Sequence, residues 1–233
     1  MPATLELPAL DTARLPTELV NGDRLTQREF HALYERMPEH VRAELIAGVV
    51  YMASPMKRKH GKNTPPLSAV LLAYENATPG TEMGESMTCI LDDENEPQPD
   101  ICLRILPEHG GQSGDTDDGY ISGAPELVCE ISDSTRSLDM NAKKREYAAA
   151  GALEYLVLNL RDSRLHWFDL KANQELTADP DGIIRVRVFP GLWIDPAAVV
   201  ARDLRALLAT LDKGLASADH AAFVAELGAA KAP

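Results

Sequence analysis

The sequence predicts an α/β (α+β) protein with a mixed central sheet that is flanked by helices. Two observations indicate this class. Predicted helices alternate with short apolar strands along the chain, and 45% of the 233 residues are apolar, which suffices for a sizeable core. No internal repeat interrupts the pattern. We therefore expect one domain with appendages, namely an N-terminal arm (1–23), a core domain (24–196) and a C-terminal helical tail (197–233).

The first half of the chain predicts two helices around a bent strand. Thr26 can cap a helix that begins with QREF, and Glu29 completes a capping box. ELIAGVVYMAS is typical of a strand with a bend or a hairpin corner at Gly48. The basic segment MKRKHGKNTPP predicts a loop, and the apolar spacing after it predicts a helix over 67–76.

The second half predicts strands around one helix and ends in helical sequence. Strands are expected at MTCILDD, PDICLRIL and ELVCEIS, with a Gly- and Asp-rich surface excursion over 107–122. The spacing predicts a helix over 139–150 that ends at Gly151. LEYLVLNL, RLHWFDL and GIIRVRVF then read as three consecutive strands, and the Ala- and Leu-rich end as one or two amphipathic helices.

Charge and cysteine content exclude several functional classes. The 36 acidic residues outnumber the 23 Lys and Arg, which gives a net charge of −13. This charge disfavours a general nucleic-acid coat or an anionic-membrane binder, so any phosphate-binding surface must be a local patch. Cys89, Cys102 and Cys129 lie apart in apolar runs, as expected for reduced buried thiols. The chain has neither a signal-peptide pattern nor a bilayer-spanning apolar run, so we expect a cytoplasmic protein without membrane contact.

Three carboxylates stand where the strand pattern does not explain them. Glu130 lies inside the apolar strand LVCEIS, Asp100 precedes ICLRIL, and Glu44 begins ELIAGVVYM. An ionised glutamate inside such a strand is costly unless it is paired, metal-bound or at an open edge. Each acid alone could equally be a solvated strand end. Together they could converge at one edge of the sheet, where Mg²⁺ or Mn²⁺ would neutralise them.

A lysine on the following helix extends this pattern. Lys143 follows Glu130 by thirteen residues and could reach back towards the carboxylates, although an exposed helix lysine is the ordinary alternative. Three acids, a divalent cation and one lysine match the hydrolysis of a phosphodiester. The metal would polarise the phosphoryl group and lower the pKa of a water, and the lysine would stabilise growing negative charge or orient that water.

These residues occur in a recognisable arrangement. ELIAGVVYMASP, QPDICL and PELVCEISDSTRSLDMNAKKREYAAAGALEYLVL together resemble the Uma-two family of endonucleases, within the PD-(D/E)XK nuclease superfamily. The resemblance implies a restriction-endonuclease-like fold in the core domain and metal binding by Glu44, Asp100 and Glu130. It also implies that the catalytic lysine has moved from position 132, here Ser132, to Lys143. The family usually has a histidine after the stretch that ends at Ser54 and Pro55; here it is His60, behind three basic residues, and the resemblance implies at most a supporting role for it.

The substrate and the assembly are less determined. We expect a magnesium-dependent deoxyribonuclease whose basic loop contacts backbone phosphates of DNA; its residues are Lys57, Arg58, Lys59 and Lys62. A solvated charge run is the alternative for this loop. The alternative for the whole protein is a catalytically silent nuclease-fold scaffold or partner-binding module. The sequence leaves DNA or RNA open, and the apolar strands near 155–189 could form a homodimer face.

Overall fold

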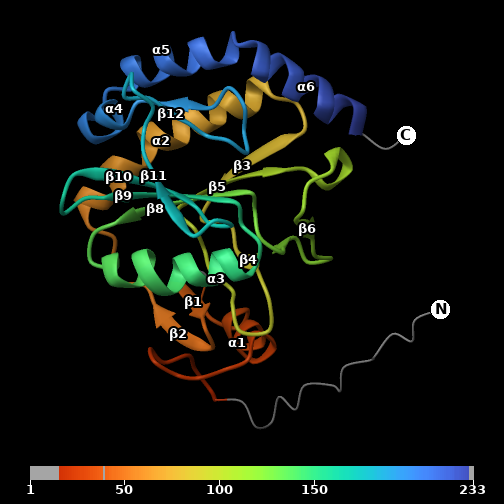
Figure 1. Cartoon of the computed structure of the whole chain (residues 1–233). Coiled ribbons are helices and arrows are strands. Elements are labelled where there is room, and N and C mark those ends of the chain that lie inside the picture. The colour runs from red at the N-terminus through yellow and green to blue at the C-terminus, as the bar shows by residue number, and fades with distance from the viewer. Residues whose placement is uncertain (1–15, 39, 231–233) are drawn as a thin grey trace.

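The centre of the molecule is a six-stranded mixed sheet. The computed structural model describes residues 16–38 and 40–230 (Figure 1). The strand order is β11-β10-β9-β8-β5-β3, in which β8 and β9 run parallel and the other neighbours antiparallel. The strands are β3 (Thr81–Glu85), β5 (Ile101–Ile105), β8 (Leu127–Ser132), β9 (Glu154–Asn159), β10 (Arg164–Asp169) and β11 (Gln174–Leu176). The predicted mixed sheet is confirmed.

Helices cover both faces of this sheet (Figure 1). The helices on the first face share the largest hydrophobic cluster with the strands; they are α2 (Arg58–Ala77), α4 (Pro196–Ala201), α5 (Leu204–Leu215) and α6 (Ala218–Ala230). A π-helical turn (Leu138–Lys143) and α3 (Lys144–Ala149) cover the second face and share a smaller cluster with it. The molecule is thus a three-layer sandwich in which a helix connects the parallel strands β8 and β9.

Strand β8 alternates between these two layers. Leu127, Cys129 and Ile131 pack into the larger cluster, whereas Val128 packs into the smaller one beside α3. Successive side chains of a strand point to opposite faces, so Glu130 shares the face of Val128. The apolar neighbours of Glu130 in the sequence therefore lie mostly on the other side of the sheet, and the carboxylate meets the π-helical turn and α3.

The N-terminal part of the described chain forms a small module with its own core. It consists of α1 (Gln27–Tyr34) and the hairpin of β1 (Ala43–Ile46) and β2 (Val49–Met52). The predicted capping box of Thr26 and Glu29 is confirmed. Ala47 and Gly48 both have positive φ, 51° and 70°, which makes the two-residue corner of the hairpin. Residues 1–15 of the predicted arm lie outside the described residues.

The prediction of a basic loop before the second helix is wrong, because α2 already begins at Arg58. Pro65 and Pro66 lie inside the helix and lack the N–H groups that would bond to the preceding turn. In the turn before them, two side chains also bond to backbone carbonyls: Asn63 Nδ2 donates to that of Lys59 at 2.7 Å, and Thr64 Oγ1 to that of His60 at 3.4 Å. The prolines therefore interrupt the hydrogen-bond ladder without ending the helix.

Two predicted strands differ in the structure. MTCILDD contributes only β4 (Cys89–Ile90), which pairs outside the central sheet. GIIRVRVF does not follow β10 in the sheet; β11 takes that edge, and β12 (Ile184–Arg185) pairs instead with β13 (Trp193–Ile194). The buried carboxylate of Glu154 explains the second difference. It accepts the backbone N–H groups of Arg187 and Val188 at 2.7 and 2.8 Å, which removes them from strand pairing.

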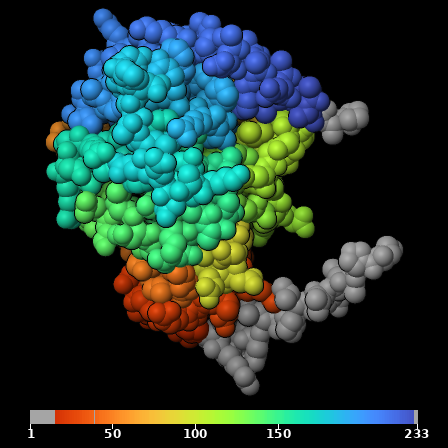
Figure 2. All heavy atoms as spheres, viewed as in Figure 1, coloured from red at the N-terminus to blue at the C-terminus, as the bar shows by residue number. Residues whose placement is uncertain are grey.

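The Gly- and Asp-rich excursion is built from short ordered pieces. A 3₁₀ turn (Pro107–His109) leads to β6 (Gly114–Asp115) and β7 (Ile121–Ser122). Strand β7 pairs with both β6 and β4, and Ile121 is buried. Figure 2 shows this segment on the surface, between the N-terminal module and the C-terminal helices, as expected for an excursion.

The C-terminal sequence forms three helices, α4 to α6, where one or two were expected. They pack on the central sheet, because Leu207, Leu211, Phe223 and Leu227 belong to the largest cluster. The side chain of His220 also lies 2.9 Å from Thr78 Oγ1 at the end of α2. The boundary at residue 196 and the homodimer stay predictions. Within the part of the chain that the structure describes, no helix is long and apolar enough to cross a membrane.

A glycine in α5 provides a test of this packing. A Cβ added to Gly214 would lie 2.1 Å from the carbonyl oxygen of Gly191, a backbone atom. We expect Gly214→Ala to lower the free energy of unfolding by about 1–3 kcal/mol, because overpacking outweighs the better helix propensity of alanine. Gly228→Ala in α6 is the matched control, since its Cβ meets nothing within 4 Å. Urea denaturation of both variants checks this, and equal stability would contradict it.

Candidate functional site

Four predicted site residues from separate elements meet on the α3 side of the sheet. Glu44 lies on β1, Asp100 directly precedes β5, Glu130 lies on β8, and Lys143 ends the π-helical turn. The Lys143 Nζ atom lies 2.8 Å from Glu44 Oε1 and 2.9 Å from Glu130 Oε1. The ammonium therefore bridges two carboxylates, one on β1 and one on β8, that are 86 positions apart in the chain.

The π-helical turn brings Lys143 to this position. A helix was predicted here, but hydrogen bonds that span five residues were not, and π-helical turns occur often at functional sites. Lys143 is 4% exposed and Glu130 also 4%, so both charged groups are out of water. Lys143 is thus a buried ion-pair partner and not the exposed helix lysine that was its alternative.

Asp100 is held beside Glu130 by the pairing of β5 with β8. Its Oδ2 atom accepts the backbone N–H of Ile131 at 2.6 Å and lies 3.1 Å from His60 Nε2. The two strands run antiparallel and pair Ile101 with Cys129. Asp100, which precedes Ile101, therefore lies close to Glu130, which follows Cys129. Asp100 is therefore fixed by the backbone of β8, next to Glu130.

Glu44 is fixed in a similar way. Its Oε1 atom accepts the backbone N–H of Gln98 at 2.7 Å. The Gln98 side chain in turn donates to Tyr34 Oη at 2.9 Å and to Thr88 Oγ1 at 3.0 Å. The hairpin of the N-terminal module is thereby tied to the segment before β5, and its glutamate reaches the site of the main sheet.

The electrostatics of the site follow from burial and from an excess of acid. Burial raises the pKa of Glu130 well above its ordinary value; Lys143 opposes this shift, and Asp100, Asp139 and Glu44 add to it. Burial lowers the pKa of Lys143, but Glu130, Glu44 and Asp139 outweigh it, so its pKa is raised. The lysine stays protonated, and one cation faces several carboxylates.

Three further residues belong to the site, although sequence reasoning gave them minor roles. His60 contacts Asp100, and its Nδ1 atom is buried with no hydrogen-bond partner among the described residues. Asp139, 2% exposed, accepts the hydroxyl of Thr135 at 2.6 Å. Tyr147 donates to Glu130 Oε1 at 3.4 Å. The spacing of four between Asp139, Lys143 and Tyr147 places all three on one helix face, which was the available signal.

The three predicted metal ligands do not converge on one point: Glu44 and Glu130 contact Lys143, whereas Asp100 contacts His60 and the N–H of Ile131. No choice of one oxygen each from Glu44, Asp100 and Glu130 brings all three within 4.8 Å of one another. Their contacts use one oxygen of each carboxylate, namely Glu44 Oε1, Asp100 Oδ2 and Glu130 Oε1. The second oxygen of each takes no part in these contacts. Carboxylate oxygens with an excess of negative charge are a donor set that suits a hard divalent cation.

The four basic residues predicted to contact nucleic acid lie at the beginning of α2. Lys57 is its N-cap, and Arg58, Lys59 and Lys62 follow in the first turns; all four are exposed. Lys59 Nζ donates to the carbonyl of Leu160 at 2.5 Å, so this side chain is partly engaged by the protein. His60 lies on the same turn and contacts Asp100. The basic turn therefore borders the acidic site.

Comparisons with known proteins identify the family and a similar fold. The model of the Uma2 family, described as "Putative restriction endonuclease", matches residues 28–198. Among solved structures, the fold is similar to "a putative nuclease belonging to DUF820" from Anabaena variabilis ATCC 29413, with a TM-score of 0.54 and 15% identity. The similarity covers 79% of this chain and 97% of that one, and at this identity it shows the fold alone. No curated protein matches the chain.

The buried ion pairs can be tested by a pair of substitutions. Lys143→Met leaves Glu130 buried without its cation, and we expect it to lower the free energy of unfolding by about 3 kcal/mol. The double variant Lys143→Met/Glu130→Gln leaves no uncompensated buried charge at this pair. We therefore expect it to be more stable than Lys143→Met alone. Urea denaturation of the parent, both single variants and the double variant measures the coupling, and additive losses would contradict it.

Proposed function

The chain belongs to the Uma2 family of "Putative restriction endonuclease" proteins, and we propose that it is a metal-dependent endonuclease that hydrolyses phosphodiester bonds of DNA. The family and the nuclease-like fold support a nuclease. The observation that carries the finer proposal is the contact of Lys143 with Glu44 and Glu130, beside Asp100. Burying acids and a lysine together costs desolvation free energy, and packing alone does not require such an arrangement.

In this proposal Glu44, Asp100 and Glu130 hold Mg²⁺, or Mn²⁺ in its place. The donor set fits either ion, because all three ligands are carboxylates and their combined charge exceeds that of Lys143. When bound, the cation would polarise a phosphoryl group and lower the pKa of a water molecule. Glu130 is where a cation would relieve the largest cost, since its burial already raises its pKa.

The chain's own residues supply position and charge for hydrolysis. In this reaction a water oxygen bonds to phosphorus, the bond from phosphorus to the leaving sugar oxygen breaks, and that oxygen takes up the proton that the water gives up, by way of solvent. Lys143 remains protonated and stabilises the negative charge that grows on the phosphate oxygens, or orients the water. Asp100 is aligned by the N–H of Ile131 and by His60. Tyr147 and Lys143 hold the same oxygen of Glu130.

The basic turn at the start of α2 suits the backbone of a nucleic acid. Lys57, Arg58 and Lys62 are exposed and stand beside His60, which contacts the acidic site. A polyanion that binds there brings its phosphates towards the carboxylates. The net charge of −13 opposes binding elsewhere on the molecule, so affinity should be weak and sensitive to salt.

Cleavage of plasmid DNA tests the proposed activity. We expect the parent to nick supercoiled plasmid with Mg²⁺ or Mn²⁺ and to lose this activity when a chelator is added. Glu130→Gln and Lys143→Met should each reduce the rate by at least about 100-fold. Glu226→Gln and Lys213→Met, which change exposed residues of α6 and α5, are the matched controls and should keep the parental rate.

Each outcome of the cleavage assay has a meaning. Equal cleavage by the parent and by both site variants would mean a contaminating nuclease. No cleavage by any folded variant, with either metal and with DNA or RNA, would overturn the proposal in favour of the silent scaffold. Circular dichroism of each variant separates a loss of activity from a loss of fold.

Salt dependence tests the basic turn. In the Glu130→Gln background, we expect replacement of Lys57, Arg58 and Lys62 by alanine to weaken DNA binding. It should also reduce the slope of log K against log salt by up to about 3, because each lost phosphate contact lowers the slope by about 1. Fluorescence anisotropy with labelled duplex DNA measures both, and exposed Lys171→Ala is the control. An unchanged slope would contradict DNA contact at this turn.

A further inference from the structure

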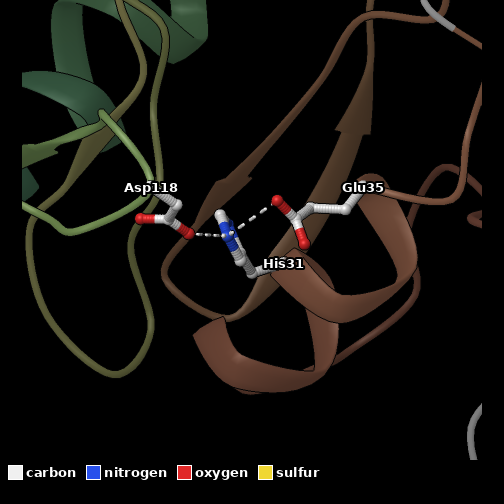
Figure 3. A group of neighbouring side chains, drawn as sticks. All are labelled: His31, Glu35 and Asp118. Carbon is white, nitrogen blue, oxygen red and sulfur yellow. Dashed lines mark ion pairs between the residues drawn. The ribbon is translucent and has the colours of Figure 1, made fainter.

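A histidine and two acids converge outside the site described above. His31 lies on α1, Glu35 is the C-cap of that helix, and Asp118 lies in the turn between β6 and β7. Figure 3 shows their side chains pointing towards one another across the gap between α1 and the excursion. One ligand atom from each lies within 4.8 Å of the other two. Among the described residues, this is the one group of three that meets this criterion.

The distances in this group suit a metal ion better than a hydrogen-bond network. His31 Nε2 lies 3.4 Å from Asp118 Oδ2 and 3.8 Å from Glu35 Oε1. Both contacts are ion pairs when the imidazole is protonated, and the nitrogen is shielded from solvent. Ligand atoms at about 2.0–2.1 Å from a tetrahedral Zn²⁺ are about 3.4 Å apart. The two distances from His31 Nε2 are therefore within about half an ångström of this spacing, and the three ligand atoms all lie within 4.8 Å of one another.

The other side of the imidazole is held as it is in metal-binding histidines. His31 Nδ1 lies 2.9 Å from Glu96 Oε1, whose side chain is fully buried. Gln27 Nε2 donates to the second oxygen of Glu96 at 2.8 Å, which fixes that carboxylate. A carboxylate that accepts the Nδ1 proton orients the ring and leaves the Nε2 lone pair for a metal. The ring of Tyr120 packs edge-on against the imidazole of His31 and further limits the rotation of that imidazole.

The charge of the group also favours a cation. Glu35, Glu96 and Asp118 surround the imidazole of His31, at 3.8, 2.9 and 3.4 Å from its nitrogens. Their negative charge attracts a divalent ion, which compensates more of that charge than a single proton does. Glu35 and Asp118 are about half exposed, so an ion can enter from solvent and keep a water as a further ligand.

We propose that His31, Glu35 and Asp118 form a second metal site, which binds a divalent transition metal, best represented by Zn²⁺. One nitrogen and two oxygen ligands with an open position are a set that Zn²⁺ accepts. The site does not depend on the proposed nuclease activity, because none of its ligands belongs to the candidate site. A metal ion bound there would link α1 to the turn between β6 and β7, because it would bind side chains from both.

Competition with a chromophoric Zn²⁺ chelator tests this site on the full chain. We expect the Glu130→Gln protein to bind one equivalent of Zn²⁺ as tightly as the parent, since its change lies elsewhere. Glu35→Gln and Asp118→Asn alter half-exposed side chains that should not affect folding, and each should weaken Zn²⁺ binding by at least about tenfold. Asp117→Asn removes the same charge from the same exposed turn and is the matched control, with parental affinity.

Thermal unfolding gives a second readout. Zn²⁺ should raise the Tm of the parent and of Asp117→Asn, and should raise that of Asp118→Asn less, because the stabilisation of the folded state by a ligand increases with the logarithm of its affinity. No Zn²⁺ competition by the parent would overturn the proposal. Equal affinity in the parent, Glu35→Gln and Asp118→Asn would also overturn it. Neither result would bear on plasmid cleavage, which the Glu130→Gln variant tests separately.

Discussion

The ammonium of Lys143, held between Glu44 and Glu130 away from water, constrains most of the surrounding structure. Each of the three groups would be costly in that place without the others, so the elements that carry them must be positioned together. The hairpin of the N-terminal module must reach the main sheet, β8 must present Glu130 to the second face, and the π-helical turn must direct Lys143 towards it. Hydrogen bonds to Gln98 and Ile131 show how the backbone secures Glu44 and Asp100 for this arrangement.

The sheet allows this because it has two different faces. The first face packs under α2 and the C-terminal helices in a large apolar cluster, which supplies most of the hydrophobic burial. The second face packs under α3 in a smaller cluster, and the charged groups of Glu44, Glu130 and Lys143 lie on this side of the sheet. Alternation along β8 lets one strand serve both purposes. A charged residue in an apolar strand is therefore compatible with a stable core when its partners come from a helix on the same face.

Peripheral segments add chemistry to this centre. The basic turn of α2 borders the acidic residues through the contact of His60 with Asp100, which joins a basic surface to a carboxylate site. In the N-terminal module, the excursion meets α1 at His31, where Asp118 lies beside the imidazole. Both contacts join segments that are distant in sequence, and both pair a histidine with an aspartate. The two proposed cation sites are therefore separate, and each draws its side chains from different elements.

The sequence by itself determined the fold class, the capping box, the hairpin corner, the strand β8 and the identity of the acids, because these depend on local periodicity and on single residues out of pattern. The chain's family followed from the same segments. Only the tertiary structure decided that Pro65 and Pro66 lie within a helix, that Glu154 withdraws Arg187 and Val188 from the sheet, and that Lys143 bridges two carboxylates. These features depend on side chains that satisfy distant backbone groups and on the partners available to a buried charge. No local pattern records such partners, since they are adjacent only after the chain has folded.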